Sequence, residues 1–249
     1  MIIIKSKREI ELMREAGRIV AHTHKVLAKL IKPGITTLEL DKVAYDTITS
    51  MGATPSFKGY GGFPGSICAS INEVLVHGIP SNTKLKDGDI ISIDIGAYYK
   101  GYHGDSAWTY ACGNVNPETL KLMEVTKESL FKGLELVKPN NRIGDIAHAI
   151  QTYVESHGYS LPSDYTGHGV GTSLHEDPMI PNLGKPNTLE RIKEGMVFAV
   201  EPMVHMGKPF TRVLGDDWTV ISKDKSLTAH YEHTVVVTND GYEILTKED

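Results

Sequence analysis

Leu85 to Asp94 reads LKDGDIISID, and Ile192 to Glu201 reads IKEGMVFAVE, so the second stretch restates the first without a gap. In each, a turn built on Asp-Gly or Glu-Gly leads into an apolar run that ends in a carboxylate, Asp94 or Glu201. A charge inside an apolar strand is costly unless a partner or a metal ion compensates it. The two stretches therefore predict related strands whose acids form halves of one site.

The sequence around these strands is repeated as well. In the predicted helices, corresponding residues of the two halves differ by a constant number of positions. Lys32-Pro33 corresponds to Lys138-Pro139, and Gly52 corresponds to Gly158. Each half reads helix, Lys-Pro break, helix, glycine stop, loop and strands. When gaps are allowed in the alignment of the two halves, HGIP at His77 matches HEDP at His175, and HGD at His103 matches HYE at His230. The repeat predicts a single domain of two αβ halves, about 1–112 and 113–249, facing each other across a pseudo-two-fold axis.

Capping signals delimit the helices. Ser6 with Glu9, and Thr36 with Glu39, form capping boxes that start the first two helices, which end near Lys32-Pro33 and Gly52. Asn116-Pro117 starts a third helix that runs to about Val137, and a fourth spans about 143–157. The third helix is expected to bury the apolar residues Leu120, Met123, Leu130 and Leu134.

The strand Ile90 to Ala97 is followed at once by a return strand, GYHGDSAWTY, at Gly101 to Tyr110. A turn at Tyr99-Lys100 would set Asp94 directly opposite Asp105, with Cβ atoms roughly 5 Å apart. Two such carboxylates repel, so one of them must hold a proton or both must share a cation.

The candidate site residues are Asp94, Asp105, Glu201 and Glu232, each on a predicted strand, and His168 between two glycines. Considered without the acids, His168 is equally consistent with a hydrogen-bonding role in a loop and with metal ligation. Oxygen and nitrogen donors without a thiol indicate a site for two divalent cations. In such sites the metals lie about 3.5–4 Å apart and share a water that ionises to hydroxide, which suits hydrolysis of an amide.

Composition and charge indicate which partners and which cell compartment suit this chain. The 249 residues carry a net charge of −5, which does not indicate a nucleic-acid or anionic-membrane partner. Two cysteines suit a reducing compartment. The apolar start, Met1 to Ile4, is broken by Lys5 and is expected to be neither a signal peptide nor a membrane span. A cytoplasmic location is the expectation.

An aromatic, glycine-rich loop, PSFKGYGGFPG, spans Pro55 to Gly65. Its glycine spacing lacks the Lys-Ser/Thr ending of a phosphate-binding loop. Its aromatics, Phe57, Tyr60 and Phe63, suit either ordinary core or the lining of a site, and the glycines favour the lining.

Five motifs together carry a resemblance to a known family. They are SINEVLVHGIP at Ser70 to Pro80, DIISIDIGAYYKGYHGDSAWT at Asp89 to Thr109, GHGVGTSLHEDP at Gly167 to Pro178, VFAVEPM at Val197 to Met203 and HYEHTVVV at His230 to Val237. The chain resembles the type I methionine aminopeptidases in their short bacterial form, from the first helix to Thr246. The resemblance implies an α+β pita-bread fold around a central curved antiparallel sheet, with residues 1–249 as one catalytic domain.

The resemblance also implies an activity: removal of the initiator methionine from nascent chains whose second residue is small. It assigns two divalent ions (Co, Mn, Fe or Zn) to Asp94, Asp105, His168, Glu201 and Glu232, with Asp105 and Glu232 bridging. Glu201 is implied to shuttle the proton, and His77 and His175 to contact the scissile amide. The methionine pocket maps onto Phe57, Tyr60, Phe63, Cys68, Leu174 and Trp218.

The implied partners are nascent polypeptide amino termini at the ribosome, met by a monomer without membrane or specific nucleic-acid contacts. The chain departs from some members of the family at three positions. Some relatives have a histidine where this chain has Gly61, some have a large aromatic residue where it has Leu174, and many have glutamine where it has His230.

Two other functions remain open at this point. One is a pita-bread scaffold that binds peptide, RNA or protein without catalysis, and the other is a hydrolase that prefers a prolyl second residue.

Overall fold

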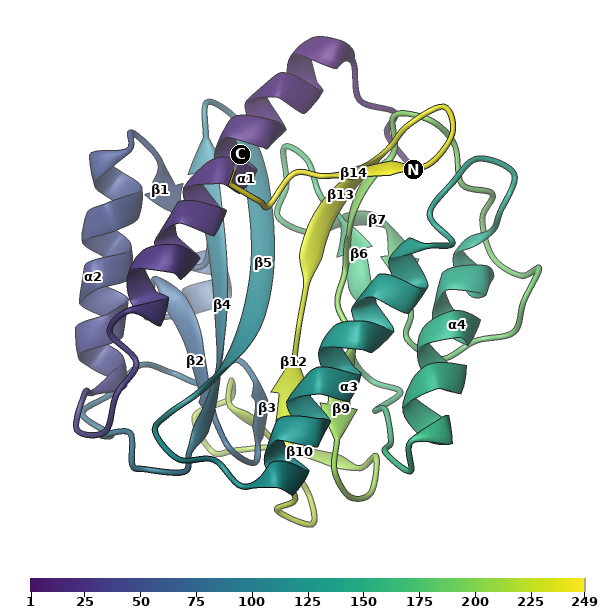
Figure 1. The fold of residues 1–249 in the computed structure, drawn as a ribbon. Coiled ribbons are helices and arrows are strands. Elements are labelled where there is room, and N and C mark those ends of the chain that lie inside the picture. Colours follow the sequence, from purple (N-terminus) through teal and green to yellow (C-terminus); the bar gives the residue numbers. More distant parts are fainter. Residues whose placement is uncertain (249) are drawn as a thin grey trace.

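The computed structural model describes residues 1–248. Two pairs of helices cover the outer side of curved sheets, the first pair on the N-terminal half and the second pair on the C-terminal half (Figure 1). The helices are α1 (Lys7–Ala28), α2 (Thr37–Ser50), α3 (Pro117–Leu134) and α4 (Ile143–Ser156). These bounds lie within a few residues of the predicted ones.

The predicted caps are present at the helix starts. Ser6 and Glu9 form a reciprocal capping box on α1, and Thr36 and Glu39 form another on α2. Each box satisfies backbone N–H groups that a helix start leaves without an intrahelical partner. The Asn116 side chain caps α3, whose first residue is Pro117. Local sequence alone therefore specifies where these helices begin.

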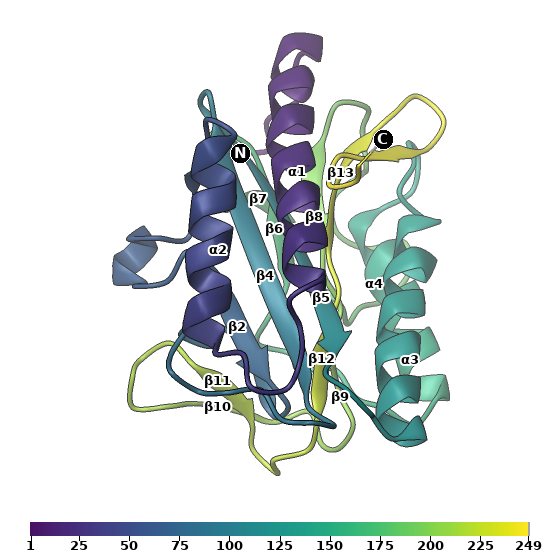
Figure 2. The same cartoon turned by 60° about the vertical axis from the view of Figure 1, so that its left-hand side comes forward.

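The strands of the N-terminal half form an antiparallel sheet built on the long β4–β5 hairpin, with α1 and α2 over one face (Figure 2). Its strands are β1 (Thr54–Pro55), β2 (Ile67–Ile71), β4 (Ile90–Tyr99) and β5 (Tyr102–Ala111). A short helical turn, η1 (Tyr60–Gly62), follows β1. Ile91, Ile93 and Ile95 of β4 pack into the core beneath α1 and α2, which turns Asp94 to the opposite face.

The C-terminal half forms the sheet β14-β13-β8-β6-β7 and two smaller sheets, β12-β9 and β10-β11-β3, the last of which includes a strand of the first half. The strands are β3 (Val74–Val76), β6 (Gly167–Gly169), β7 (Glu176–Ile180), β8 (Val197–Val200), β9 (Met203–His205), β10 (Thr211–Val213), β11 (Val220–Ser222), β12 (Thr228–His230), β13 (His233–Val237) and β14 (Tyr242–Ile244).

The β4–β5 turn differs from the prediction. Lys100 and Gly101 are its central residues, with φ of 46° and 97°, as in a type I′ turn, which needs positive φ at both positions and favours glycine at the second. Asp94 consequently pairs with Ala107, and Asp105 pairs with Gly96. The prediction that Asp94 stands directly opposite Asp105 is wrong. The two acids lie diagonally on the same face, because the register differs by an even number of residues.

Hydrogen bonds join β5 to the segment between β12 and β13, so the two halves meet at their acid-bearing strands. The backbone N–H of Glu232 donates to the Ala107 carbonyl at 2.8 Å, and the Ser106 hydroxyl donates to the Glu232 carbonyl at 2.6 Å. The Thr234 hydroxyl donates to the Asp105 carbonyl at 2.7 Å. These bonds bring Asp105 and Glu232 to one place, although the residues are far apart in sequence.

Each helix pair covers its own apolar core. One core lies under α1 and α2, and another lies under α3 and α4. Leu130 and Leu134 are buried as predicted, whereas Leu120 is 47% exposed, because the buried face of α3 passes through Leu122 and Val125 instead. Within residues 1–248, no helix is long and apolar enough to cross a membrane.

Candidate metal centre and peptide pocket

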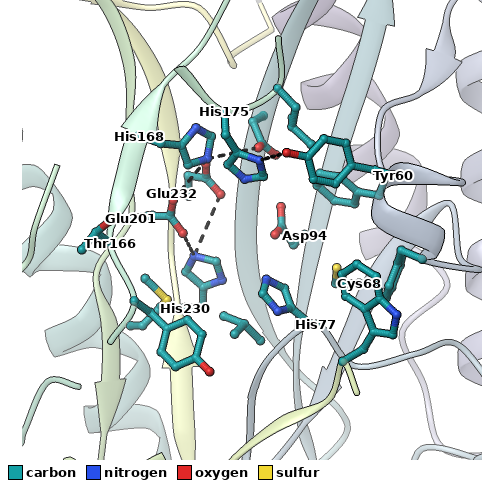
Figure 3. Close-up of a pocket in the computed structure, with 18 of the residues that line it drawn as sticks. Tyr60, Cys68, His77, Asp94, Thr166, His168, His175, Glu201, His230 and Glu232 are labelled. Atoms are coloured by element: carbon teal, nitrogen blue, oxygen red, sulfur yellow. Dashed lines mark hydrogen bonds and ion pairs between the residues drawn. The ribbon is translucent and has the colours of Figure 1, made fainter. Parts of the chain in front are cut away.

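A cavity of about 330 Å³ opens between the two halves, and every site residue predicted above lines it (Figure 3). The residues that line it are Phe57, Tyr60, Phe63, Cys68, Val76, His77, Asp94, Asp105, Asp164, Tyr165, Thr166, His168, Leu174, His175, Glu201, Met203, Trp218, His230 and Glu232. Acidic and imidazole groups therefore share one cavity with aromatic and aliphatic side chains.

Four carboxylates enter this cavity from both halves. Asp94 lies in β4 and Asp105 in β5, as predicted. Glu201 directly follows β8, and Glu232 lies in the gap between β12 and β13. The expectation that all four acids sit on strands is thus wrong for the two glutamates. Their side chains nevertheless line the cavity.

Burial dominates the electrostatics of the four acids. Asp105, Glu201 and Glu232 are 3%, 8% and 1% exposed. Loss of water raises the pKa of Asp94 to about 7 and that of Glu201 to about 8. Burial, reinforced by the neighbouring carboxylates, raises the pKa of Asp105 and Glu232 well above the usual range. Without a cation, the site therefore holds protons.

His168 enters the cavity from β6 with its ring orientation fixed. Its Nδ1 lies 2.9 Å from the Gly169 carbonyl, so Nδ1 carries the proton and Nε2 offers a lone pair. That Nε2 lies 3.5 Å from Glu201 Oε1 and 3.7 Å from Asp105 Oδ2. A Cβ on Gly167 or Gly169 would come within 2.4 Å or 2.2 Å of a neighbouring carbonyl oxygen, so glycine on both sides lets β6 lie close to its neighbours.

The donor set fits divalent cations. Among the described residues, Asp94 Oδ1, Asp105 Oδ1 and Glu232 Oε1 are buried without a hydrogen-bond partner. Asp105, His168 and Glu232 offer ligand atoms within 4.8 Å of one another, and so do Glu201, His230 and Glu232. Unpartnered buried carboxylate oxygens are costly, and cations would remove that cost. Oxygen and imidazole donors suit borderline divalent metals.

His77 and His175 line the same cavity as the carboxylates, and His175 lies next to His168 (Figure 3). The His77 ring lies edge-on to Tyr165 and Trp218, at 6.3 Å from each ring. His175 lies 4.2 Å from the His168 ring, and its Nδ1 is 2.8 Å from the Tyr60 hydroxyl. Burial lowers the pKa of His77 to about 4 and also lowers that of His175. Both rings are therefore neutral near pH 7.

The predicted apolar pocket residues also lie together. Phe57, Phe63, Cys68 and Leu174 form a buried cluster against which Trp218 packs. Phe63 and Trp218 meet edge to face at 5.1 Å. Burial, with the nearby Asp94 and Asp105 charges, raises the pKa of the Cys68 thiol well above its usual range, so Cys68 acts as an apolar wall. Tyr60 differs from the cluster because it is 47% exposed.

Several residues that line the cavity were not assigned to the site from the sequence. They are Val76, Asp164, Tyr165, Thr166, Met203 and His230. Most of them lie within a few positions of His77, His168, Glu201 or Glu232 in the sequence. Closeness to a predicted site residue was therefore the sequence signal that could have identified them. Alternation along β8 does not extend across the break at residues 201–202, so it does not place Met203 in the cavity.

The chain is similar in sequence and structure to known metallopeptidases. A model of metallopeptidase family M24 matches residues 11–239. The chain is 59% identical over 247 residues to methionine aminopeptidase 1 of Bacillus subtilis (strain 168), covering 99% of this chain and 100% of the relative. The crystal structure of methionine aminopeptidase from Rickettsia prowazekii is similar with a TM-score of 0.98 at 44% identity, covering 99% of this chain and 100% of that one.

A more distant likeness is the prolidase from Pyrococcus furiosus. Its TM-score is 0.82 at 26% sequence identity, and the match covers 99% of this chain but 66% of the prolidase. The shared architecture thus extends beyond a single substrate class, whereas the high identities over full length belong to proteins named methionine aminopeptidase.

Proposed function

The chain belongs to metallopeptidase family M24 and is a type I methionine aminopeptidase of the bacterial form, and we propose that the cavity between its halves is the active site. The prediction of a pita-bread fold is confirmed, and so is a metal-dependent hydrolase that removes amino-terminal methionine. The observation that carries the proposed site is the meeting of four buried carboxylates and His168 beside an apolar pocket.

We treat residues 1–249 as one catalytic domain composed of halves 1–112 and 113–249. The hydrogen bonds between β5 and the segment 230–234 support this proposal, because the backbone carbonyls of Glu232 and Asp105 each accept from a side-chain hydroxyl of the opposite half. Neither half contains a complete donor set. Asp94 and Asp105 come from the first, and His168, Glu201 and Glu232 come from the second.

The five residues Asp94, Asp105, His168, Glu201 and Glu232 are proposed to hold two divalent ions. Asp105 and Glu232 lie at the junction of the halves and would be the acids shared by both ions. When bound, such ions polarise the scissile carbonyl and activate water for attack. The residues do not determine whether cobalt, manganese, iron or zinc is bound, because oxygen and imidazole donors accept all four.

Glu201 is proposed to move the proton. Its carboxyl is buried in the cavity beside the other proposed ligands, where a carboxylate can accept a proton from water and return it. Glu201 takes a proton from the attacking water as the new bond to the carbonyl carbon forms. It then gives that proton to the amide nitrogen as the C–N bond breaks, and methionine leaves with its new carboxylate.

His77 and His175 are proposed to bind the peptide backbone. Both rings are neutral and line the cavity together with the carboxylates. An N–H aimed at the developing oxyanion stabilises it more than it stabilises the planar amide, which lowers the barrier. Removal of one such donor typically slows an enzyme by about 10²–10³-fold.

The methionine side chain is proposed to occupy the cluster of Phe57, Phe63, Cys68, Leu174 and Trp218, with Tyr60 at the rim. An unbranched thioether suits an apolar pocket with aromatic walls, where sulfur-aromatic contacts add about 0.3–1.5 kcal/mol. We also propose a preference for a small second residue, which the resemblance in the five sequence motifs implies.

The proposed substrates are nascent amino termini at the ribosome, and we place the protein in the cytoplasm as a monomer. Cys68 and Cys112 are both free thiols in the structure, which suits a reducing compartment. The net charge of −5 supports a partner surface other than bulk nucleic acid.

The deciding experiment compares Met-Ala-Ser, Leu-Ala-Ser, Met-Lys-Ser and Ala-Pro-Ser as substrates of the metal-loaded enzyme. We expect rapid release of methionine from Met-Ala-Ser, slow cleavage of Met-Lys-Ser and little cleavage of the other two. Equal rates on Met-Ala-Ser and Leu-Ala-Ser would overturn the assigned methionine pocket. Preferential cleavage of Ala-Pro-Ser would favour the prolidase-like alternative, and no cleavage under any metal would favour a binding scaffold.

A further inference from the structure

His230 lies at the end of β12 and points into the same cavity as the predicted ligands (Figure 3). Its Nε2 is 3.2 Å from Glu201 Oε2 and 3.9 Å from Glu232 Oε2. The side chain is only 2% exposed. A ring nitrogen thus stands against two of the carboxylates that form the proposed metal centre.

The contact between His230 and the glutamates is not a hydrogen bond. Within the described chain, His230 Nε2 is a buried nitrogen without any hydrogen-bond partner. The histidine His24 gives the contrast, since its Nδ1 meets the Tyr110 hydroxyl and its Nε2 meets the Ser106 carbonyl, each at 2.9 Å. An orienting histidine would aim an N–H at one carboxylate oxygen, whereas His230 aims its nitrogen between two.

The spacing suits shared coordination of a cation. Ligand atoms about 2.0–2.2 Å from a zinc-like ion lie roughly 3–3.5 Å apart in tetrahedral or octahedral geometry. The separation of 3.2 Å between His230 Nε2 and Glu201 Oε2 lies in that range. The ligand atoms of Glu201, His230 and Glu232 lie within 4.8 Å of one another, and those of Asp105, His168 and Glu232 satisfy the same limit. Glu232 is common to both sets.

The backbone holds His230 firmly in this place. Its N–H donates to the Thr109 hydroxyl at 2.9 Å, and the same hydroxyl donates to the His230 carbonyl at 2.9 Å. The β12–β9 ladder also pairs His230 with Met203, two positions after Glu201. The ring is therefore fixed relative to both β5 and the Glu201 segment before any ion binds.

We propose that His230 is a second imidazole ligand of the metal centre and binds through Nε2 beside Glu201 and Glu232. The inference rests on the metal centre proposed above and adds one donor to it. Each of the two compact sets then contains one imidazole, His168 or His230. A second nitrogen shifts preference toward cobalt, nickel and zinc, and away from manganese, which favours oxygen ligands.

Proton NMR of the Co(II)-loaded protein provides a direct test. A coordinated imidazole has an exchangeable ring N–H whose resonance the paramagnetic ion shifts far downfield. We expect two such resonances in the unaltered protein, one in His230→Gln and one in His168→Gln. His148→Gln, at an exposed position on α4, is the matched control and should retain both.

The count in the unaltered protein decides the question even if a variant fails to fold. A single shifted resonance that disappears in His168→Gln would overturn the proposal for His230 and leave the metal centre intact. The absence of any shifted resonance with Co(II) present would instead overturn the metal centre itself, and with it the proposed active site.

Metal affinities give a second readout. Calorimetric titration should show that His230→Gln binds Co(II) and Zn(II) more weakly by at least about tenfold, with a change of less than about threefold for Mn(II). An equal loss for all three metals would mean that His230 only orients Glu201, and would overturn the proposal. Circular dichroism of each variant checks that the fold is retained.

Discussion

Asp94 and Glu201 hold matching places in the repeated stretches, yet their environments differ. Asp94 lies within the β4–β5 ladder, where it pairs with Ala107, whereas the Glu201 segment is held at its backbone carbonyl by the Asn182 amide at 3.0 Å. Their proposed roles differ accordingly: Asp94 holds a cation, and Glu201 also carries the proton.

Asp94→Asn and Glu201→Gln should each lower kcat on Met-Ala-Ser by at least about 10²–10⁴-fold, because each removes a charge from the metal centre and the second also removes the proton carrier. Turnover at fixed, saturating metal is the measurement, with circular dichroism as the check on folding. Asp46→Asn, at an exposed position on α2, is the control and should retain full turnover. Near-normal rates for Asp94→Asn or Glu201→Gln would contradict the assigned site.

Tyr60 connects the exposed rim to the reacting centre through a single bond, from its hydroxyl to His175 Nδ1. Tyr60→Phe keeps the ring and removes that bond, so we expect kcat to fall by about three- to tenfold, the equivalent of roughly 1 kcal/mol. KM for Met-Ala-Ser should change little, because the apolar wall is preserved. Tyr45→Phe, on the exposed face of α2, should have no effect. A change confined to KM would mean that Tyr60 only contacts the substrate.

A buried ion pair joins the segment before α1 to the start of β7, next to His175. Lys5 Nζ lies 2.6 Å from Glu176 Oε2, and the two side chains are only 3% and 9% exposed. The Glu176 carboxylate also accepts from the Ser173 backbone N–H and the Thr172 hydroxyl. This carboxylate therefore organises the loop next to His175.

Lys5→Met should lower the free energy of unfolding by about 3–5 kcal/mol, because it leaves the Glu176 charge buried without its partner. Urea denaturation monitored by circular dichroism measures the loss. The comparison is Lys42→Met, which breaks the exposed pair with Asp46 and should change stability very little. If Lys5→Met and Lys42→Met cost the same, the buried pair contributes no more than a surface pair.

Over the whole molecule, the buried carboxylates make stability depend on metal and pH together. The pKa values of Asp94 and Glu201, raised to about 7 and about 8 in the folded metal-free protein, exceed their usual values. The folded state consequently binds more protons than the unfolded chain over this range, and stability falls as pH rises through those values. Cations replace the protons and remove this loss.

Chelation of the metal should therefore lower the melting temperature more at about pH 8.5 than at about pH 6.5. Thermal unfolding with and without chelator at both pH values is the measurement. The buried histidines His24 and His233, with pKa lowered to about 4 and about 3, titrate below this window and affect both samples alike. An equal effect of chelation at the two pH values would show that the carboxylates do not hold excess protons when the metal is absent.

The sequence by itself determined the elements, the duplication and most of the site. Capping boxes at Ser6 and Thr36 specify helix starts because their bonds are local. The match of LKDGDIISID with IKEGMVFAVE located two of the acids, because a carboxylate in an apolar strand needs compensation. Resemblance in five motifs then supplied the substrate, which no local pattern encodes.

Only the tertiary structure decided how these parts meet. The register between Asp94 and Asp105 depends on the turn at Lys100 and Gly101, which both have positive φ. The alternation of apolar residues along the strands was equally compatible with a turn one residue earlier. Placement of Glu232 and His230 depended on hydrogen bonds from Ser106 and Thr109 across the two halves. Periodicity describes one strand at a time, whereas a shared cavity arises from packing between strands remote in sequence.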